Sequence, residues 1–177
     1  MPRYISILFR EFVEICTFQK RPQDLPASGE LCLLVVSVYL ASGWILMLSA
    51  ESVSKSLIMS IIDVVMLLLI TLLFLYLRSV PGRWLQTSTA LAGTGIIFYL
   101  LLSAPFYLRV YFPGNVSMQA FMELLILFLY LWLIAVMSYI LKNALSSSYL
   151  LAIPGAISYF VITGIVIKFL FPEVDTQ

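Results

Sequence analysis

Residues 56–77 read SLIMSIIDVVMLLLITLLFLYL, a run of 22 residues in which Asp63 is the sole formally charged side chain. As an α-helix rising 1.5 Å per residue, this run would be about 33 Å long, enough to cross the roughly 30 Å hydrocarbon core of a bilayer. A membrane-spanning strand alternates polar and apolar positions, and the run shows no such alternation. It therefore predicts a transmembrane helix.

Four more apolar runs of similar length occur in the chain. The five predicted spans cover residues 31–48, 56–77, 85–106, 118–141 and 150–171. The composition agrees, since 62% of the residues are hydrophobic and only 11% are charged, against roughly 25% charged residues in soluble domains. We expect an all-α integral membrane bundle of five transmembrane helices in residues 31–177, preceded by a distinct segment in residues 1–30.

The first part of that segment has the pattern of an amphipathic helix. Within residues 1–21, apolar side chains such as Leu8 and Phe12 recur at helical spacing, and charged side chains occupy the other flank. A helix of this kind is expected to be interfacial, lying in the inner headgroup layer with its apolar side chains in the acyl boundary. Packing beneath the bundle is the alternative.

A proline-containing elbow follows, with the sequence KRPQDLPAS at residues 20–28. Its two prolines stop the amphipathic helix, and Ser28 is placed to cap the first span. One interpretation is a hinge between a horizontal and a vertical helix. The other is a docking surface for a cytoplasmic partner, formed by Lys20, Arg21, Gln23 and Asp24.

Basic residues are divided unevenly between the two sides of the predicted bundle. If the N-terminus is cytoplasmic, seven of the ten Lys and Arg residues fall on the inner side, and only Lys55, Arg109 and Lys168 fall on the outer side. This division follows the positive-inside rule. We therefore expect a cytoplasmic N-terminus and, with five spans, an outer C-terminus.

Ionisable residues within the spans matter because a charge near mid-membrane costs several kcal/mol unless it is paired or hydrated. Asp63 lies about seven residues into the second span, roughly 10 Å from its outer end. Glu123 lies at a similar depth in the fourth span, and Lys168 lies about one turn from the outer end of the fifth. Together they could form a proton or cation site or a structural pairing, or Glu123 and Lys168 could snorkel to the interface. Arg109 is a further possible partner.

The residue content argues against most catalytic chemistry. The chain has no histidine, and it contains no metal-ligand spacing, Walker A loop or dinucleotide fingerprint. We therefore expect no enzymatic activity, no cofactor and no metal site. A net charge of +1, with no basic patch beyond Lys20 and Arg21, argues against nucleic acid as a partner. Small residues in the third and fifth spans, such as Gly93 and Gly95, predict close helix contacts within the bundle or with a second copy.

The architecture and one segment carry a family resemblance. A polar N-terminal segment ending in the elbow of residues 20–28 precedes five closely spaced spans, and residues 132–145 read WLIAVMSYILKNAL. In these features the chain resembles the uncharacterised bacterial branch of the Yip-type five-span membrane proteins. The resemblance implies a multi-pass protein of the bacterial inner membrane, without enzymatic activity, that acts through other membrane components.

Two functional hypotheses follow from the sequence. The first is a non-enzymatic scaffold or accessory subunit, with the lipid bilayer and a membrane-protein partner or second copy as its partners. The alternative is a small transporter or channel that uses Asp63 and Glu123 as a proton or cation site. The first hypothesis gives most weight to the N-terminal helix and elbow, and the second gives most weight to Asp63.

Overall fold

The computed structural model describes the backbone of residues 2–111 and 114–172, and side-chain environments for residues 6–109 and 114–172. Throughout this described part the chain is helical, without strands. In chain order the elements are α1 (Pro2–Cys16), η1 (Pro22–Asp24), α2 (Gly29–Met47), α3 (Val53–Leu77), η2 (Pro81–Arg83), α4 (Trp84–Tyr111), α5 (Val116–Ala144) and α6 (Tyr149–Leu170). The labels η1 and η2 denote single turns of 3-10 helix.

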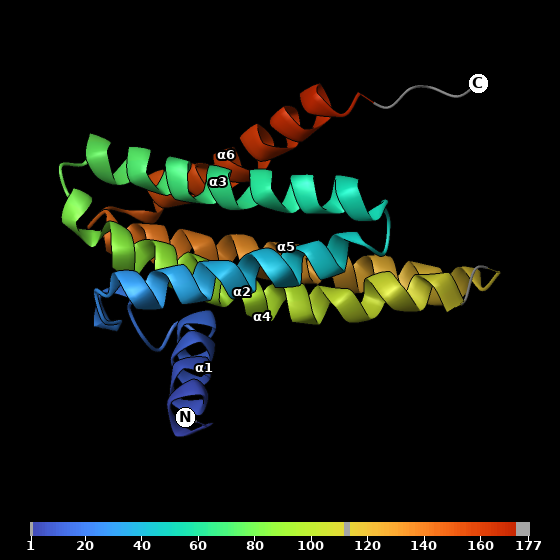
Figure 1. Ribbon diagram of the computed structural model, residues 1–177, viewed down its shortest axis with the longest axis horizontal. Coiled ribbons are helices and arrows are strands. Elements are labelled where there is room, and N and C mark those ends of the chain that lie inside the picture. The colour runs from blue at the N-terminus through green and yellow to red at the C-terminus, as the bar shows by residue number, and fades with distance from the viewer. Residues whose placement is uncertain (1, 112–113, 173–177) are drawn as a thin grey trace.

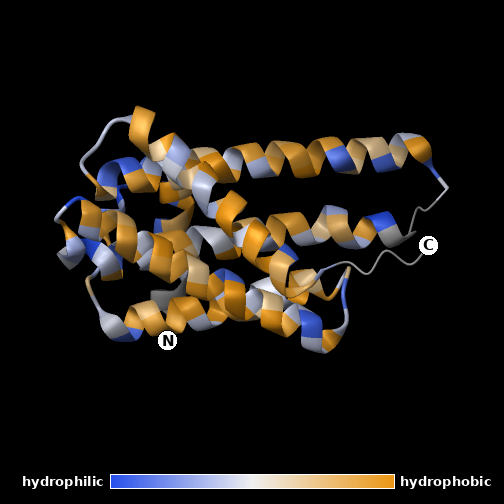
Figure 2. Ribbon diagram, turned by 90° about the horizontal axis from the view of Figure 1, so that it is seen from above, coloured by the Kyte–Doolittle hydropathy of each residue, from blue (hydrophilic) through white to orange (hydrophobic). Residues whose placement is uncertain are grey.

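The described residues contain five helices, α2 to α6, that are long and apolar enough to cross a membrane. The protein is therefore an integral membrane protein, and the five predicted spans are confirmed. Figure 2 shows hydrophobic residues along the length of these helices, with hydrophilic residues gathered mostly toward the ends of the bundle. Several helices are longer than the predicted spans and extend to a capping residue. α5, for example, begins at Val116 rather than at residue 118, and Asn115 Oδ1 caps it by accepting a hydrogen bond from the Met118 amide at 3.1 Å.

The long helices lie alongside one another, with their ends at two poles (Figure 1). We call the pole with η1, η2 and the α5–α6 connection the basic end, because five of the ten Lys and Arg residues lie in or beside these connections: Lys20, Arg21, Arg78, Arg83 and Lys142. The opposite end carries the α2–α3 connection. At the basic end, Ser28 Oγ accepts a hydrogen bond from the Leu31 amide, so Ser28 caps α2 as predicted.

α4 is the central helix of the bundle. It contacts α1, η1, α2, α3 and α5, and residues 87–95 are buried on every side of the helix. Small side chains such as Ala90 and Ala92 allow neighbouring helices to approach this closely. The threonines in this segment are accommodated because their hydroxyls donate to backbone carbonyls one turn earlier, for example Thr94 Oγ1 to Ala90 O at 2.8 Å.

α1 lies crosswise to the bundle (Figure 1) and packs against α4 and α5. Phe12, Ile15 and Cys16 are buried at this contact, and the Phe12 ring lies directly against the backbone of Gly93. The opposite side of α1 exposes apolar side chains, including Phe9. The predicted amphipathic helix is thus present, and its apolar stripe is divided between the bundle and the surroundings.

Candidate functional site: a carboxylate held by tyrosines

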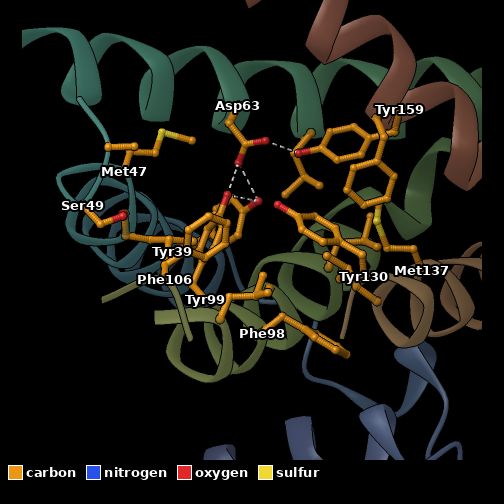
Figure 3. Close-up of a pocket in the computed structure, with 18 residues that line it drawn as sticks. Tyr39, Met47, Ser49, Asp63, Phe98, Tyr99, Phe106, Tyr130, Met137 and Tyr159 are labelled. Atoms are coloured by element: carbon orange, nitrogen blue, oxygen red, sulfur yellow. Dashed lines mark hydrogen bonds between the residues drawn. The ribbon is translucent and has the colours of Figure 1, made fainter. Parts of the chain in front are cut away.

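Asp63 lies in the interior of the bundle and accepts hydrogen bonds from three tyrosine hydroxyls. The Tyr39 and Tyr99 hydroxyls donate to Asp63 Oδ2 at 2.6 and 2.7 Å, and the Tyr159 hydroxyl donates to Oδ1. Only 8% of the Asp63 surface is exposed. We call these four residues the Asp63 cluster (Figure 3). The cluster joins α2, α3, α4 and α6 at one point.

The cluster lies at the middle of the spanning helices. Tyr39, Asp63, Tyr99 and Tyr159 each lie within two residues of the midpoint of their helix. Tyr130 is the middle residue of α5, and it lines the same cavity as the cluster. Asp63 is ten residues from the start of α3, about 15 Å along the axis, so it lies deeper than the 10 Å expected from the sequence. The difference arises because α3 begins at Val53 rather than at residue 56.

Two glycines seat the rings of the cluster. Tyr39 and Tyr99 stack on each other with centroids 4.9 Å apart and planes 22° apart. The Tyr39 ring of α2 lies against Gly95 of α4, and a Cβ added to Gly95 would come within 3 Å of that ring. The Tyr99 ring of α4 lies against Gly43 of α2, and a Cβ added to Gly43 would lie 2.9 Å from that ring. Each helix thus contributes one ring and one glycine, and the two glycines allow α2 and α4 to pack closely against the rings.

A cavity of about 240 Å³ surrounds the cluster. Its walls are mostly aromatic and aliphatic, and residues of the α2–α3 connection, including Ser49 and Ala50, also line it. Figure 3 shows Met47 and Ser49 on one side of Asp63 and Tyr130 and Met137 on the other. The cavity therefore extends from the middle of the bundle toward the opposite end.

Electrostatically, Asp63 has no cationic partner in the described part of the chain. The ion pairs found there join Arg10 to Glu14, Lys20 to Glu11, Lys55 to Glu51 and Arg109 to Glu123. The cavity walls include no Lys or Arg side chain. Three tyrosine hydroxyls thus surround the carboxyl group, and no cationic side chain of the described residues forms an ion pair with it.

The three intramembrane charges predicted from the sequence do not form one cluster. Glu123 pairs with Arg109 at 3.6 Å, and both side chains are largely exposed. Lys168 is exposed near the end of α6 and makes no ion pair among the described residues. Arg109, named above as a possible further partner of the three charges, pairs with Glu123, while Asp63 stands apart with the tyrosines.

Hydrogen bonds of Gln23 and Gln86 hold the elbow against the bundle. Gln23 Nε2 donates to the carbonyl of Asn143, and Gln86 Nε2 donates to the carbonyls of Gln23 and Leu25 at 3.0 and 2.8 Å. Lys20 pairs with Glu11 of α1. Among the four predicted docking residues, Arg21 and Asp24 are exposed, and the Asp24 carboxylate accepts a bond from the Arg21 amide.

Sequence reasoning identified Asp63 but missed its four tyrosine neighbours. Interfacial aromatic residues are common in membrane proteins, and the sequence offers many. The usable signal was positional, because one tyrosine or aspartate falls near the centre of every span: Tyr39, Asp63, Tyr99, Tyr130 and Tyr159. No group of three or more possible metal-ligating side chains occurs within the described residues.

Comparison of the chain with protein-family models, curated proteins and solved structures finds no match.

Proposed function

We propose that this protein binds a cation at the Asp63 cluster and acts as a small transporter or channel. One observation carries the proposal. A buried carboxyl group, without a cationic partner among the described residues, lies at the middle of the spanning helices and lines a cavity that extends toward the opposite end of the bundle. Intramembrane ionisable residues of this kind mark ion or substrate pathways in membrane proteins.

A purely structural role explains the hydrogen bonds but does not require an acidic side chain at position 63. A neutral amide at position 63 would also accept hydrogen bonds from tyrosine hydroxyls, and it would avoid the cost of several kcal/mol of a charge near mid-membrane. The cavity would likewise be unnecessary for a helix-pinning contact, because close packing favours association in lipid. Glu123 is not part of the proposed site, since it is exposed and paired with Arg109.

The experiment that tests the proposal is charge displacement by reconstituted protein on a solid-supported membrane. Jumps in Na⁺, K⁺, pH and small organic cations are applied to proteoliposomes that contain the full chain, Asp63→Asn or Glu123→Gln. We expect at least one cation to evoke a saturable current in the full chain and in Glu123→Gln, and no current in Asp63→Asn. Equal currents in the full chain and Asp63→Asn would refute the proposal.

A second candidate function is a non-enzymatic scaffold of the bacterial inner membrane, related to the Yip-type proteins, with a cytoplasmic N-terminus. It is supported by the excess of basic residues at the basic end and by the apolar side chains that α1 exposes, including Ile7 at 50% and Phe9 at 53%. A partner protein or a second copy would bind there. Its test is co-purification in a gentle detergent, where Phe9→Ser should lose a stoichiometric partner that Asp63→Asn retains.

A further inference from the structure

We infer that the ligand of the Asp63 cluster is a small organic ammonium ion, with one N–H donated to Asp63 and a short apolar tail along the cavity. This inference rests on the proposed function and specifies its substrate class. The ligands it excludes are a bound metal ion and a proton alone.

The walls of the cavity favour an organic cation. Seven aromatic side chains line it: Tyr39, Phe98, Tyr99, Phe106, Tyr130, Tyr159 and Phe160. An aromatic ring attracts a desolvated cation through its quadrupole, and recognition of organic ammonium groups is the main functional use of such surroundings. The remaining walls are largely aliphatic, including Leu46, Leu67 and Leu102, so they suit an alkyl tail.

The lone pairs of Asp63 leave room for one donor. A carboxylate offers about four lone-pair positions, and three are taken by hydroxyls, two at Oδ2 and one at Oδ1. The free position is therefore on Oδ1. A primary ammonium group can donate one N–H to this oxygen and supply the positive charge that the cluster lacks.

The same geometry is unfavourable for a metal ion. Hard cations such as Ca²⁺ require six to eight oxygen ligands, largely carboxylates and carbonyls. Asp63 is the one carboxylate on the cavity wall, and the described residues contain no three-member group of metal-ligating side chains. A proton needs only the carboxylate, so it would not explain the aromatic walls or the cavity.

The volume limits the size of the ligand. The cavity has a volume of about 240 Å³. It is smaller than the roughly 300–1,000 Å³ pockets that hold drug-sized ligands. A head group with a tail of about four carbons is therefore an appropriate probe.

The test is a set of binding titrations on the full chain in detergent. Binding is monitored by tryptophan fluorescence. Trp132 packs edge-on against the cavity residue Phe98 with ring centroids 5.3 Å apart, so we expect its part of the fluorescence of the three tryptophans to change when the cavity is occupied. Butylammonium is titrated beside 1-butanol, which has a similar shape without charge, and beside Na⁺ and K⁺. We expect butylammonium to bind saturably and at least about tenfold more tightly than 1-butanol, Na⁺ or K⁺.

Two variants separate the charge from the rings. Asp63→Asn should weaken butylammonium binding by at least about tenfold. Phe160→Leu keeps an apolar side chain beside Tyr159 and Tyr130 but removes a ring, and it should weaken butylammonium binding by about threefold or more. The comparison of the four ligands on the full chain needs no variant, so the inference is testable even if a variant fails to fold.

The outcomes distinguish the two proposals. If Na⁺, K⁺ or a pH jump evokes an Asp63-dependent current and butylammonium does not bind, the organic ammonium inference is wrong while the cation site stands. If no cation binds and no current is evoked, both are wrong, and the Asp63 cluster is a structural contact between helices. If 1-butanol binds as tightly as butylammonium, the inference is also refuted, because the carboxylate then contributes nothing.

Discussion

The contact between Tyr39 and Gly95 leads to a prediction about a single methyl group. In Gly95→Ala, the added Cβ would lie within 3 Å of the Tyr39 ring, closer than real Cβ contacts come. The neighbouring atoms belong to a buried ring that is also stacked on Tyr99 and hydrogen-bonded to Asp63. The ring therefore has to move, and its hydroxyl moves away from the carboxylate.

The expected cost combines three contributions. Overpacking in a close-packed core costs about 2 kcal/mol. Weakening a hydrogen bond to the carboxylate within a bundle costs about 1.5 kcal/mol. Alanine is favoured over glycine in a helix by about 1 kcal/mol, which offsets part of the loss. Gly95→Ala should therefore lower the free energy of unfolding by about 2–3 kcal/mol.

Gly164→Ala is the matched control for this prediction. A Cβ at Gly164 meets nothing within 4 Å, and the residue lies in the spanning helix α6. The same substitution there should leave the free energy of unfolding unchanged or raise it by up to about 1 kcal/mol. The assay is SDS-induced unfolding in mixed micelles, followed by far-ultraviolet circular dichroism.

A double-mutant cycle tests the physical cause. Tyr39→Phe removes the hydroxyl but keeps the ring, so Gly95→Ala then has no hydrogen bond to disturb. The two substitutions together should cost about 1–2 kcal/mol less than the sum of the separate costs. Equal effects of Gly95→Ala and Gly164→Ala would show that the α2–α4 contact is loose, and the account of the seated rings would be wrong.

Four further predictions concern residues outside the Asp63 cluster. Burial raises the pKa of the Cys16 thiol to about 12, so the reactive thiolate is scarce at pH 7–8. Maleimide labelling of Cys16 should therefore be slow in the folded protein. Unfolding lowers the pKa of the thiol, and labelling should become fast. Gly93→Ala should displace the Phe12 ring and speed the labelling of Cys16 under native conditions. Gln86→Leu, which removes two hydrogen bonds to the elbow, should lower the free energy of unfolding by about 1–3 kcal/mol and speed proteolysis within residues 20–28. Glu123→Gln should change stability by less than about 1 kcal/mol, because its ion pair is largely exposed; a larger loss in SDS titration would contradict this assignment.

Local composition was sufficient to predict the membrane fold. Each span is a run of apolar residues long enough to cross a bilayer, and the backbone of such a run must satisfy its own hydrogen bonds as a helix. The Ser28 cap was also predictable, because it depends on neighbouring residues in the chain. The span ends were less accurate, since helices continue beyond the apolar region until a cap or turn stops them.

Gln23 in the elbow shows a contact that the sequence could not predict. Polar residues between two prolines indicate exposure, yet Gln23 bonds to the α5 carbonyl of Asn143, 120 residues later in the chain. Sequence spacing carries no information about that contact, because it depends on how the ends of α4 and α5 meet the elbow. The same holds for the α1 contact with Gly93, where a small residue in one span receives a ring from the N-terminal helix.

The sequence by itself determined the solvent of this protein, the number of its spanning helices and the presence of a costly charge in the second span. Only the tertiary structure decided what surrounds that charge. Asp63 lies next to Tyr39, Tyr99 and Tyr159 because four helices turn one face each toward a common point. In lipid, hydrophobicity does not choose which face of an apolar helix turns inward, so the choice rests on close contacts such as Gly95 against Tyr39. Those contacts join residues far apart in the chain, and they exist only in the packed bundle.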